Sequence, residues 1–353
     1  MEDYFNFYSL FLGFFVSLIT CIIILLTKNK HFYRYNTDQT PQKIHTDYVP
    51  RIGGLSIILG IGSQFYFLYP ENLEFYKSLF LISVGVFLIG FIEDLRQDLK
   101  PIVRLALCFC ISCIISDVLL LKITYVNIDL IDNLLLITSV SLVFTVIAIT
   151  TLIQSFNIID GLNGLAIISA KLMISGIGII SYLQGDVFIM VICMITLGPL
   201  LAFLIINFPL GKIFLGDGGA YFLGVWIAVL VIMLSERNLE VSPYCSLLLI
   251  IFPVYEMFRS FCRRCIKSIS ETTLPDLEHF HSIIYKRVAK SNLNYSWKRN
   301  SLASSITLIL PLTTCLSAVI FYDNEQILIF LIFLYIFIKE LVLFTLKKTI
   351  DLN

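Results

Sequence analysis

The stretch VFIMVICMITLGPLLAFLIINF, residues 187–208, decides the fold class because it runs for 22 residues without one charged side chain. A helix needs about 20 predominantly apolar residues to cross the hydrocarbon core of a bilayer. The rest of the chain has the same character, since 58% of its 353 residues are hydrophobic and only 14% are charged. Soluble proteins have roughly 45–50% apolar and 25% charged residues. The sequence therefore predicts a membrane protein and excludes an ordinary soluble or disordered fold.

Ten further apolar runs resemble this stretch in length and composition. The eleven predicted spans are residues 5–26, 53–69, 78–92, 102–121, 134–153, 162–182, 187–208, 220–234, 244–261, 302–322 and 327–346. The chain shows no internal repeat, so we expect one all-α, polytopic, membrane-embedded domain over residues 1–353. In the longest loop, residues 278–288 are expected to form a short amphipathic helix at the membrane interface.

Lysine and arginine are distributed unequally between the two sides of this predicted bundle. One side, which includes the carboxyl-terminal tail, carries 19 of them, whereas the other carries only Lys77, Lys122 and Arg237. By the positive-inside rule, the amino terminus lies outside the cell and the carboxyl terminus in the cytoplasm, as for a multi-pass protein of the inner (cytoplasmic) membrane. The formal net charge of zero argues against nucleic acid as a partner.

Acidic and amide side chains gather at span ends on the predicted cytoplasmic side. This set comprises Glu93, Asp94, Asn157, Asp160, Asn163 and Asp217. A carboxylate costs about 2.5–3.5 kcal/mol at the centre of a membrane helix, so acids kept at the membrane edge indicate a polar site. Simpler interpretations also exist: Glu93 and Asp94 as a solvated helix end, and residues 157–164 as a capped turn.

Two neighbouring segments provide groups that suit a diphosphate. Residues 216–219, Gly-Asp-Gly-Gly, form a flexible turn whose backbone N–H groups can approach phosphate at the start of a helix. His279 and His281, with Arg287 close by in the sequence, add cationic phosphate ligands. Mg²⁺ takes one or two oxygen ligands from protein and the rest from phosphates and water, and Asn157 and Asp217 supply such oxygens. Mn²⁺ is the alternative ion.

Five segments, in this order along the chain, resemble the motifs of the polyprenyl-phosphate N-acetylhexosamine-1-phosphate transferases, glycosyltransferase family 4. The segments are Lys43 and His45 with residues 50–54, residues 90–94 followed by Arg104, residues 157–164, residues 207–219, and residues 279–281 leading to Arg287. Each motif is short, but together they span most of the chain. This family includes the phospho-N-acetylmuramoyl-pentapeptide transferase of peptidoglycan synthesis.

The resemblance implies a reaction and a set of roles. UDP-N-acetylhexosamine and polyprenyl phosphate would give polyprenyl-diphosphate-sugar and UMP, with Mg²⁺. The implied catalytic residues are Glu93, Asp94, Asp160 and Asp217, and the implied metal ligands are Asn157 and Asp217. The implied substrate ligands are Lys43, His45, Arg104, Asn163, Phe214, His279, His281 and Arg287.

Two positions depart from the family's usual pattern. Glu93 replaces the first residue of an Asp-Asp pair, and Asn163 replaces the second Asp of an Asp-Gly-x-Asp-Gly turn. The branch devoted to surface polysaccharides such as O-antigen resembles this chain in both respects, which favours that branch. Two alternatives stay open: the peptidoglycan enzyme, and a secondary transporter, although a transporter would keep its acids near the bilayer midplane. The identity of a general base and a homodimeric state also stay open.

Overall fold

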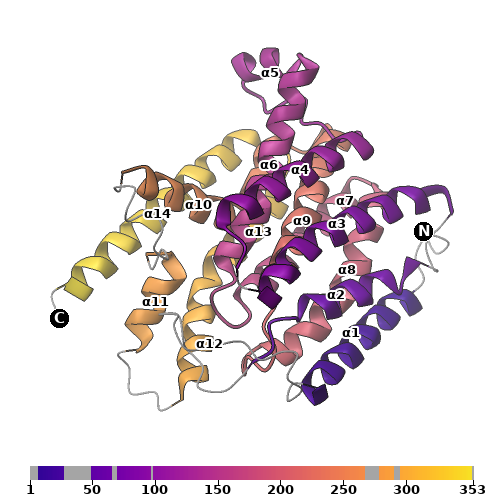
Figure 1. The fold of residues 1–353 in the computed structure, drawn as a ribbon. Helices are drawn as coiled ribbons and strands as arrows, with labels where there is room; N and C mark the ends of the chain where they lie inside the picture. Colours follow the sequence, from indigo (N-terminus) through magenta and orange to yellow (C-terminus); the bar gives the residue numbers. More distant parts are fainter. Residues whose placement is uncertain are drawn as a thin grey trace.

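The computed structural model describes residues 7–27, 49–65, 70–96, 98–266, 278–289 and 295–351. In these ranges the regular structure is helical throughout, and the helices pack as one bundle (Figure 1). The helices are α1 Phe7–Thr27, α2 Gly54–Gly62, α3 Pro70–Arg96, α4 Pro101–Val118, α5 Asp129–Leu135, α6 Thr138–Ile159, α7 Leu165–Leu183, α8 Val187–Asn207, α9 Gly216–Arg237, α10 Pro243–Ile266, α11 Phe280–Ala289, α12 Ser296–Thr307, α13 Ile309–Ile320 and α14 Glu325–Asp351.

The expected all-α, polytopic membrane fold is confirmed. Ten helical segments in the described ranges are long and apolar enough to cross a membrane, with α12 and α13 together forming one of them. The outer helices α1, α4 and α14 are each only 22% buried, and they present rings such as Phe330, Phe333 and Phe337 at the surface. Exposed apolar side chains on this scale suit a surface that faces lipid.

α9 is the central helix of the bundle, and 94% of its apolar stretch is buried. α3, α6 and α7 pack along it, and glycines allow the closest approaches. A Cβ on Gly224 of α9 would lie 2.6 Å from Cα of Ile153 in α6, so only glycine permits this separation. The positions of α3 and α6 against α9 determine which side chains meet at the two ends of α9.

The predicted span over residues 53–69 is wrong as a long helix. In its place the structure has α2, which at nine residues is about 14 Å long and cannot cross a hydrocarbon core of about 30 Å. The helix stops where Gln64 turns its side-chain amide to the carbonyl of Ile195 in α8, at 2.7 Å. The chain nevertheless passes from one end of the bundle to the other in this region. Gly53 lies beside Phe214, near the start of α9. Tyr76 lies beside Phe188, near the start of α8 and at the opposite end of the bundle.

Several other predicted spans differ in detail; residues 78–92, for example, lie within the longer helix α3. Residues 302–322 are split between α12 and α13 at Leu308, because Pro311 has no N–H to offer the Thr307 carbonyl and its ring disfavours a continuous helix. The span predicted over residues 134–153 begins too early, since α6 starts at Thr138. The separate short helix α5 precedes it and stands apart from the bundle (Figure 1). The amphipathic helix expected over residues 278–288 is present as α11.

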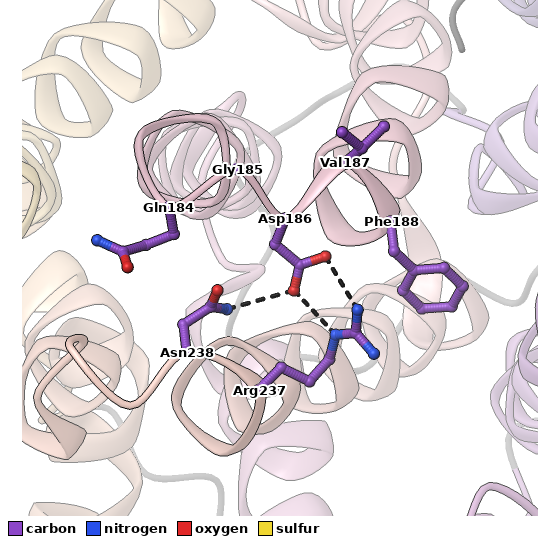
Figure 2. Close-up of a pocket in the computed structure, with 7 residues that line it drawn as sticks. All are labelled: Gln184, Gly185, Asp186, Val187, Phe188, Arg237 and Asn238. Carbon is purple, nitrogen blue, oxygen red and sulfur yellow. Dashed lines mark hydrogen bonds and ion pairs between the residues drawn. The ribbon is translucent and has the colours of Figure 1, made fainter. Parts of the chain in front are cut away.

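At the carboxyl end of α9 the chain forms a shallow pocket of about 320 Å³ (Figure 2). Asp186, which caps α8, receives hydrogen bonds from Arg237 at 2.8 and 3.2 Å and from Asn238 at 3.3 Å. The Arg237 guanidinium also lies 4.8 Å from the centre of the Phe188 ring. We call this end of the bundle the closed end, because its buried carboxylate is fully engaged with the protein's own donors.

Candidate active site

At the other end of α9, which we call the site end, the carboxyl end of α3 meets the amino end of α9. Gly90 makes the contact possible, since a Cβ there would lie 2.4 Å from the backbone nitrogen of Gly218. Four residues further along α3, the Asp94 carboxylate is 3% exposed and accepts a hydrogen bond of 3.0 Å from that same N–H. A carboxylate at a helix amino terminus is favoured by the helix dipole and by the unpaired N–H groups there.

Two arginines are each shared between two carboxylates at this end. Arg104, near the start of α4, donates to Asp217 at 2.8 Å and lies 3.6 Å from Glu93. Arg51 lies 3.8 Å from Asp217 and 4.0 Å from Asp94. These five residues are called the acidic cluster below. The helices α3, α4 and α9 therefore bring together four residues that were predicted from sequence: Glu93, Asp94, Arg104 and Asp217.

Arg51 was not among the predicted site residues, although it lies in one of the motif segments. Its position follows from backbone pairing, because Gly53 N–H donates to the Phe214 carbonyl at 2.9 Å and Phe214 N–H donates to the Pro50 carbonyl at 2.8 Å. Gly216 adopts φ +79°, and a Cβ there would lie 2.0 Å from the Arg51 carbonyl oxygen. Phe214 thus contributes its backbone to the placement of Arg51.

Asp160 faces the same cluster from the carboxyl end of α6. Burial raises the pKa of its carboxyl to about 7, the positive charge of Arg51 opposes the shift, and the negative charge of Asp217 adds to it. Asn157 lies one turn earlier in α6 and is half-buried. The Asp160 carboxyl therefore changes its charge near neutral pH, beside a cluster that is already rich in carboxylates.

Asn163 is engaged in holding the turn that follows α6. Its backbone N–H donates to Asn300 Oδ1 at 2.7 Å, and its side-chain amide donates to the Pro209 carbonyl at 3.2 Å. The next residue, Gly164, donates its N–H to Asn207 Oδ1 at 2.7 Å. Asn207 and Asn300 were not predicted as site residues, and only Asn207 lies in a motif segment. The Asn163 side chain thus braces a loop that borders the acidic cluster.

The two predicted histidines lie at the start of α11 and reach the same turn. The imidazole planes of His279 and His281 stack at 2° with centroids 5.6 Å apart. A Cβ on Gly161 would lie 2.4 Å from Nε2 of His281, so this ring packs directly against the residue after Asp160. Arg287 lies on the exposed side of α11. The predicted ligands Lys43 and His45 lie outside the described residues.

The donor chemistry of the acidic cluster suits a hard divalent cation. Its candidate ligands are carboxylate oxygens, and Oδ1 of Asp94 is buried without a hydrogen-bond donor. Among the described residues, no group of three or more His, Cys, Asp or Glu side chains is arranged to hold a metal ion. The residues present fit an ion such as Mg²⁺, which needs only one or two protein oxygens when phosphates and water complete its shell.

Comparison with known proteins agrees with this geometry. Residues 76–235 match glycosyl transferase family 4. A probable undecaprenyl-phosphate N-acetylglucosaminyl 1-phosphate transferase of Bacillus subtilis is 26% identical over 277 residues, covering 76% of this chain and 75% of that protein. The undecaprenyl-phosphate alpha-N-acetylglucosaminyl 1-phosphate transferase of Thermotoga maritima is 27% identical over 272 residues, or 77% of this chain and 78% of that protein. The Escherichia coli K12 protein of that name is 24% identical over 254 residues, with 69% and 67% covered.

Fold and site together define a polytopic membrane protein with a cluster of carboxylates and arginines at one end of its bundle. The interval shared with the family runs from α3 to the end of α9 and contains Glu93, Asp94, Arg104, Asp160 and Asp217. Residues 76–235, which hold most of the site, are similar to glycosyl transferase family 4. The resemblance stated from the motif segments is confirmed.

Proposed function

We propose that this protein transfers an N-acetylhexosamine 1-phosphate from a UDP-sugar to a polyprenyl phosphate, releasing UMP. One observation carries the proposal: Glu93, Asp94, Arg104 and Asp217 converge from three helices at one end of a membrane bundle. The relatives are named for transfer to undecaprenyl phosphate, which supports a polyprenyl phosphate as the acceptor. A site at a membrane edge suits one substrate that is a lipid and another that is soluble.

The residues of the acidic cluster have distinct tasks in this proposal. Arg51 and Arg104 neutralise the phosphates of the two substrates, and each lies beside two carboxylates of the cluster. An oxygen of the lipid phosphate attacks the phosphorus that carries the sugar. The bond from that phosphorus to the bridging oxygen breaks, and the electron pair leaves with UMP. Positioning and charge neutralisation supply most of the catalysis in such a transfer.

Asp217 and Asn157 are the residues that we propose to hold Mg²⁺, with Mn²⁺ as the alternative ion. The bound ion would neutralise charge on the diphosphate. Asp217 presently shares its two oxygens between Arg104 and Arg51, at 2.8 and 3.8 Å, so it can exchange one cationic partner for another. Asp94 keeps the amino end of α9 in place through Gly218, and this fixes the position of Asp217 one residue earlier.

The site end faces the cytoplasm in this proposal, and the membrane is the inner one. The excess of lysine and arginine on the loops of that side supports the orientation. A cysteine-free variant with Lys286→Cys should be protected from an impermeant thiol reagent in intact cells. The matched variant Glu240→Cys, exposed just beyond α9 at the closed end, should be labelled. Labelling of the first and protection of the second would refute the orientation.

The test of the function is a donor screen with purified protein in detergent. Each radiolabelled UDP-sugar is incubated with undecaprenyl phosphate, and lipid-linked product and UMP are measured. We expect one UDP-N-acetylhexosamine to be consumed, with equal amounts of UMP and lipid product, in a reaction that EDTA stops and Mg²⁺ restores. Consumption of UDP-N-acetylmuramoyl-pentapeptide alone would assign the protein to peptidoglycan synthesis. No lipid product with any donor would refute the proposal.

A further inference from the structure

A buried pair of opposite charges joins α10 to the carboxyl-terminal helix α14, outside the interval shared with the family. Lys339 Nζ lies 2.7 Å from Oε1 of Glu256, and both side chains are 0% exposed. A buried ion pair contributes little net stability, because desolvation of both charges opposes their attraction. Ionisable residues inside membrane bundles more often serve a function than a packing need. The same two helices are already linked by the more exposed pair Arg259–Glu340, at 2.9 Å.

The second oxygen of Glu256 points to the histidine segment. Oε2 lies 3.4 Å from Nδ1 of His279 and accepts the backbone N–H of Phe280 at 3.3 Å. Lys339 contacts the same segment, because its ammonium lies 5.8 Å from the centre of the Phe280 ring. The rings of Phe252, Tyr255 and Tyr335 complete an aromatic cage around that ammonium. Both members of the pair therefore hold the residues that begin α11.

The contacts continue from this segment to the acidic cluster. The His279 ring stacks on His281, and His281 packs against Gly161, which follows Asp160. We propose that the Glu256–Lys339 pair is a positioning device: it holds His279 and His281 against the Asp160–Gly161 turn of the proposed active site. This inference rests on the proposed function for its catalytic consequence. Glu256 and Lys339 act through the histidines and contact no substrate.

The lysine is necessary in this arrangement because Glu256 has to remain a hydrogen-bond acceptor. A buried carboxylate without its counter-charge takes up a proton or moves toward water. Either change weakens the hold on His279 Nδ1 and on the Phe280 N–H. A side chain that accepts hydrogen bonds without a charge would not need the lysine, and this makes the proposal testable with paired substitutions.

Three variants and one control separate positioning from packing. Lys339→Met should lower kcat for sugar-phosphate transfer by about 100-fold, the cost of a displacement of about 1 Å in a tightly positioned site. Glu256→Gln/Lys339→Met should recover most of this loss, because the amide oxygen still accepts from His279 and Phe280. Glu256→Ala/Lys339→Met should not recover it. The control Lys347→Met, also in α14, removes a half-exposed pair with Glu278 and should change kcat by less than about twofold.

Equal recovery by the Gln and Ala double variants, or an unchanged kcat in Lys339→Met, would overturn the proposal. A second measurement is independent of the reaction: hydrogen exchange of the peptide that contains Phe280, in the purified full-length protein. Its amide should exchange faster in Lys339→Met than in the wild type, and at nearly the wild-type rate in Glu256→Gln/Lys339→Met and in Lys347→Met. Unchanged protection in Lys339→Met would refute the positioning role even if the donor screen showed no transfer.

Discussion

The two ends of α9 each carry a carboxylate paired with arginine, but the pairing differs. At the closed end one carboxylate, Asp186, accepts two hydrogen bonds from Arg237 and one from Asn238 (Figure 2). At the site end Arg104 is divided between Glu93 and Asp217. Saturated pairing fixes a helix end. An arginine that is shared between two carboxylates can exchange one of them for a phosphate, and a carboxylate can exchange its arginine for a cation. This difference separates the proposed active site from an ion pair with a structural role.

The largest expected effect comes from one substitution made at both ends of α9. Asp217→Asn should lower transfer by about 10²–10³-fold or more, because a charged ligand in a preorganised site becomes neutral. Asp186→Asn should leave transfer within about threefold of wild type, since its partners lie at the far end of the helix. Initial rates at limiting Mg²⁺ measure both. A loss at Asp186 as large as that at Asp217 would remove the distinction between the two ends.

A second comparison is made inside the acidic cluster, between neighbouring carboxylates of α3. Asp94 is buried and holds the Gly218 N–H, whereas Glu93 is half-buried and accepts the Leu99 N–H at 3.0 Å. Asp94→Asn should therefore cost about 100-fold in kcat through displacement of the start of α9. Glu93→Gln should cost about tenfold, less than the 10²–10⁴-fold of an obligatory general base. A pH–rate profile of both variants shows whether Glu93 acts as a general base. A thousandfold loss for Glu93→Gln at pH 8 would identify Glu93 as the base.

Much of the fold and part of the site could be predicted from the sequence. Long uncharged runs such as residues 187–208 determine spanning helices on their own, because the hydrocarbon core accepts little else. Acids at span ends were predicted to meet, and Glu93, Asp94 and Asp217 do meet. The short α2 could not be predicted, because its end depends on the contact between Gln64 and the Ile195 carbonyl, 131 positions away. The role of Lys339 was missed for the same reason: its partner lies on another helix.

A third prediction concerns Asp160, whose pKa of about 7 lies well above the usual value near 4. The folded protein therefore binds this proton more tightly than the unfolded chain does. The contribution of the protonated group to stability is present at low pH and is lost as pH rises through about 7. In EDTA, the Tm of the wild type should fall relative to that of Asp160→Asn between about pH 4 and 7. Parallel Tm profiles for the two proteins would contradict the shift.

The smallest expected effect is at the closed end, where Asp186 has the opposite behaviour. Burial alone would raise the pKa of its carboxyl, but the hydrogen bonds from Arg237, the Ile189 N–H and Asn238 outweigh burial and lower it. The contribution to stability is therefore present above the ordinary pKa near 4 and is lost as pH falls through the lower folded value.

Asp186→Asn should cost about 1 kcal/mol at pH 7, a modest loss because the Arg237 side chain is 46% exposed and screened by water. The difference in stability from wild type should shrink below pH 4, where the unfolded chain takes up this proton before the folded protein does, and Arg237→Met should show the same pH dependence. Denaturant titrations at pH 7 and pH 3.5 measure it, and a difference that grows on acidification would show that the pairing at this end is not what fixes α9.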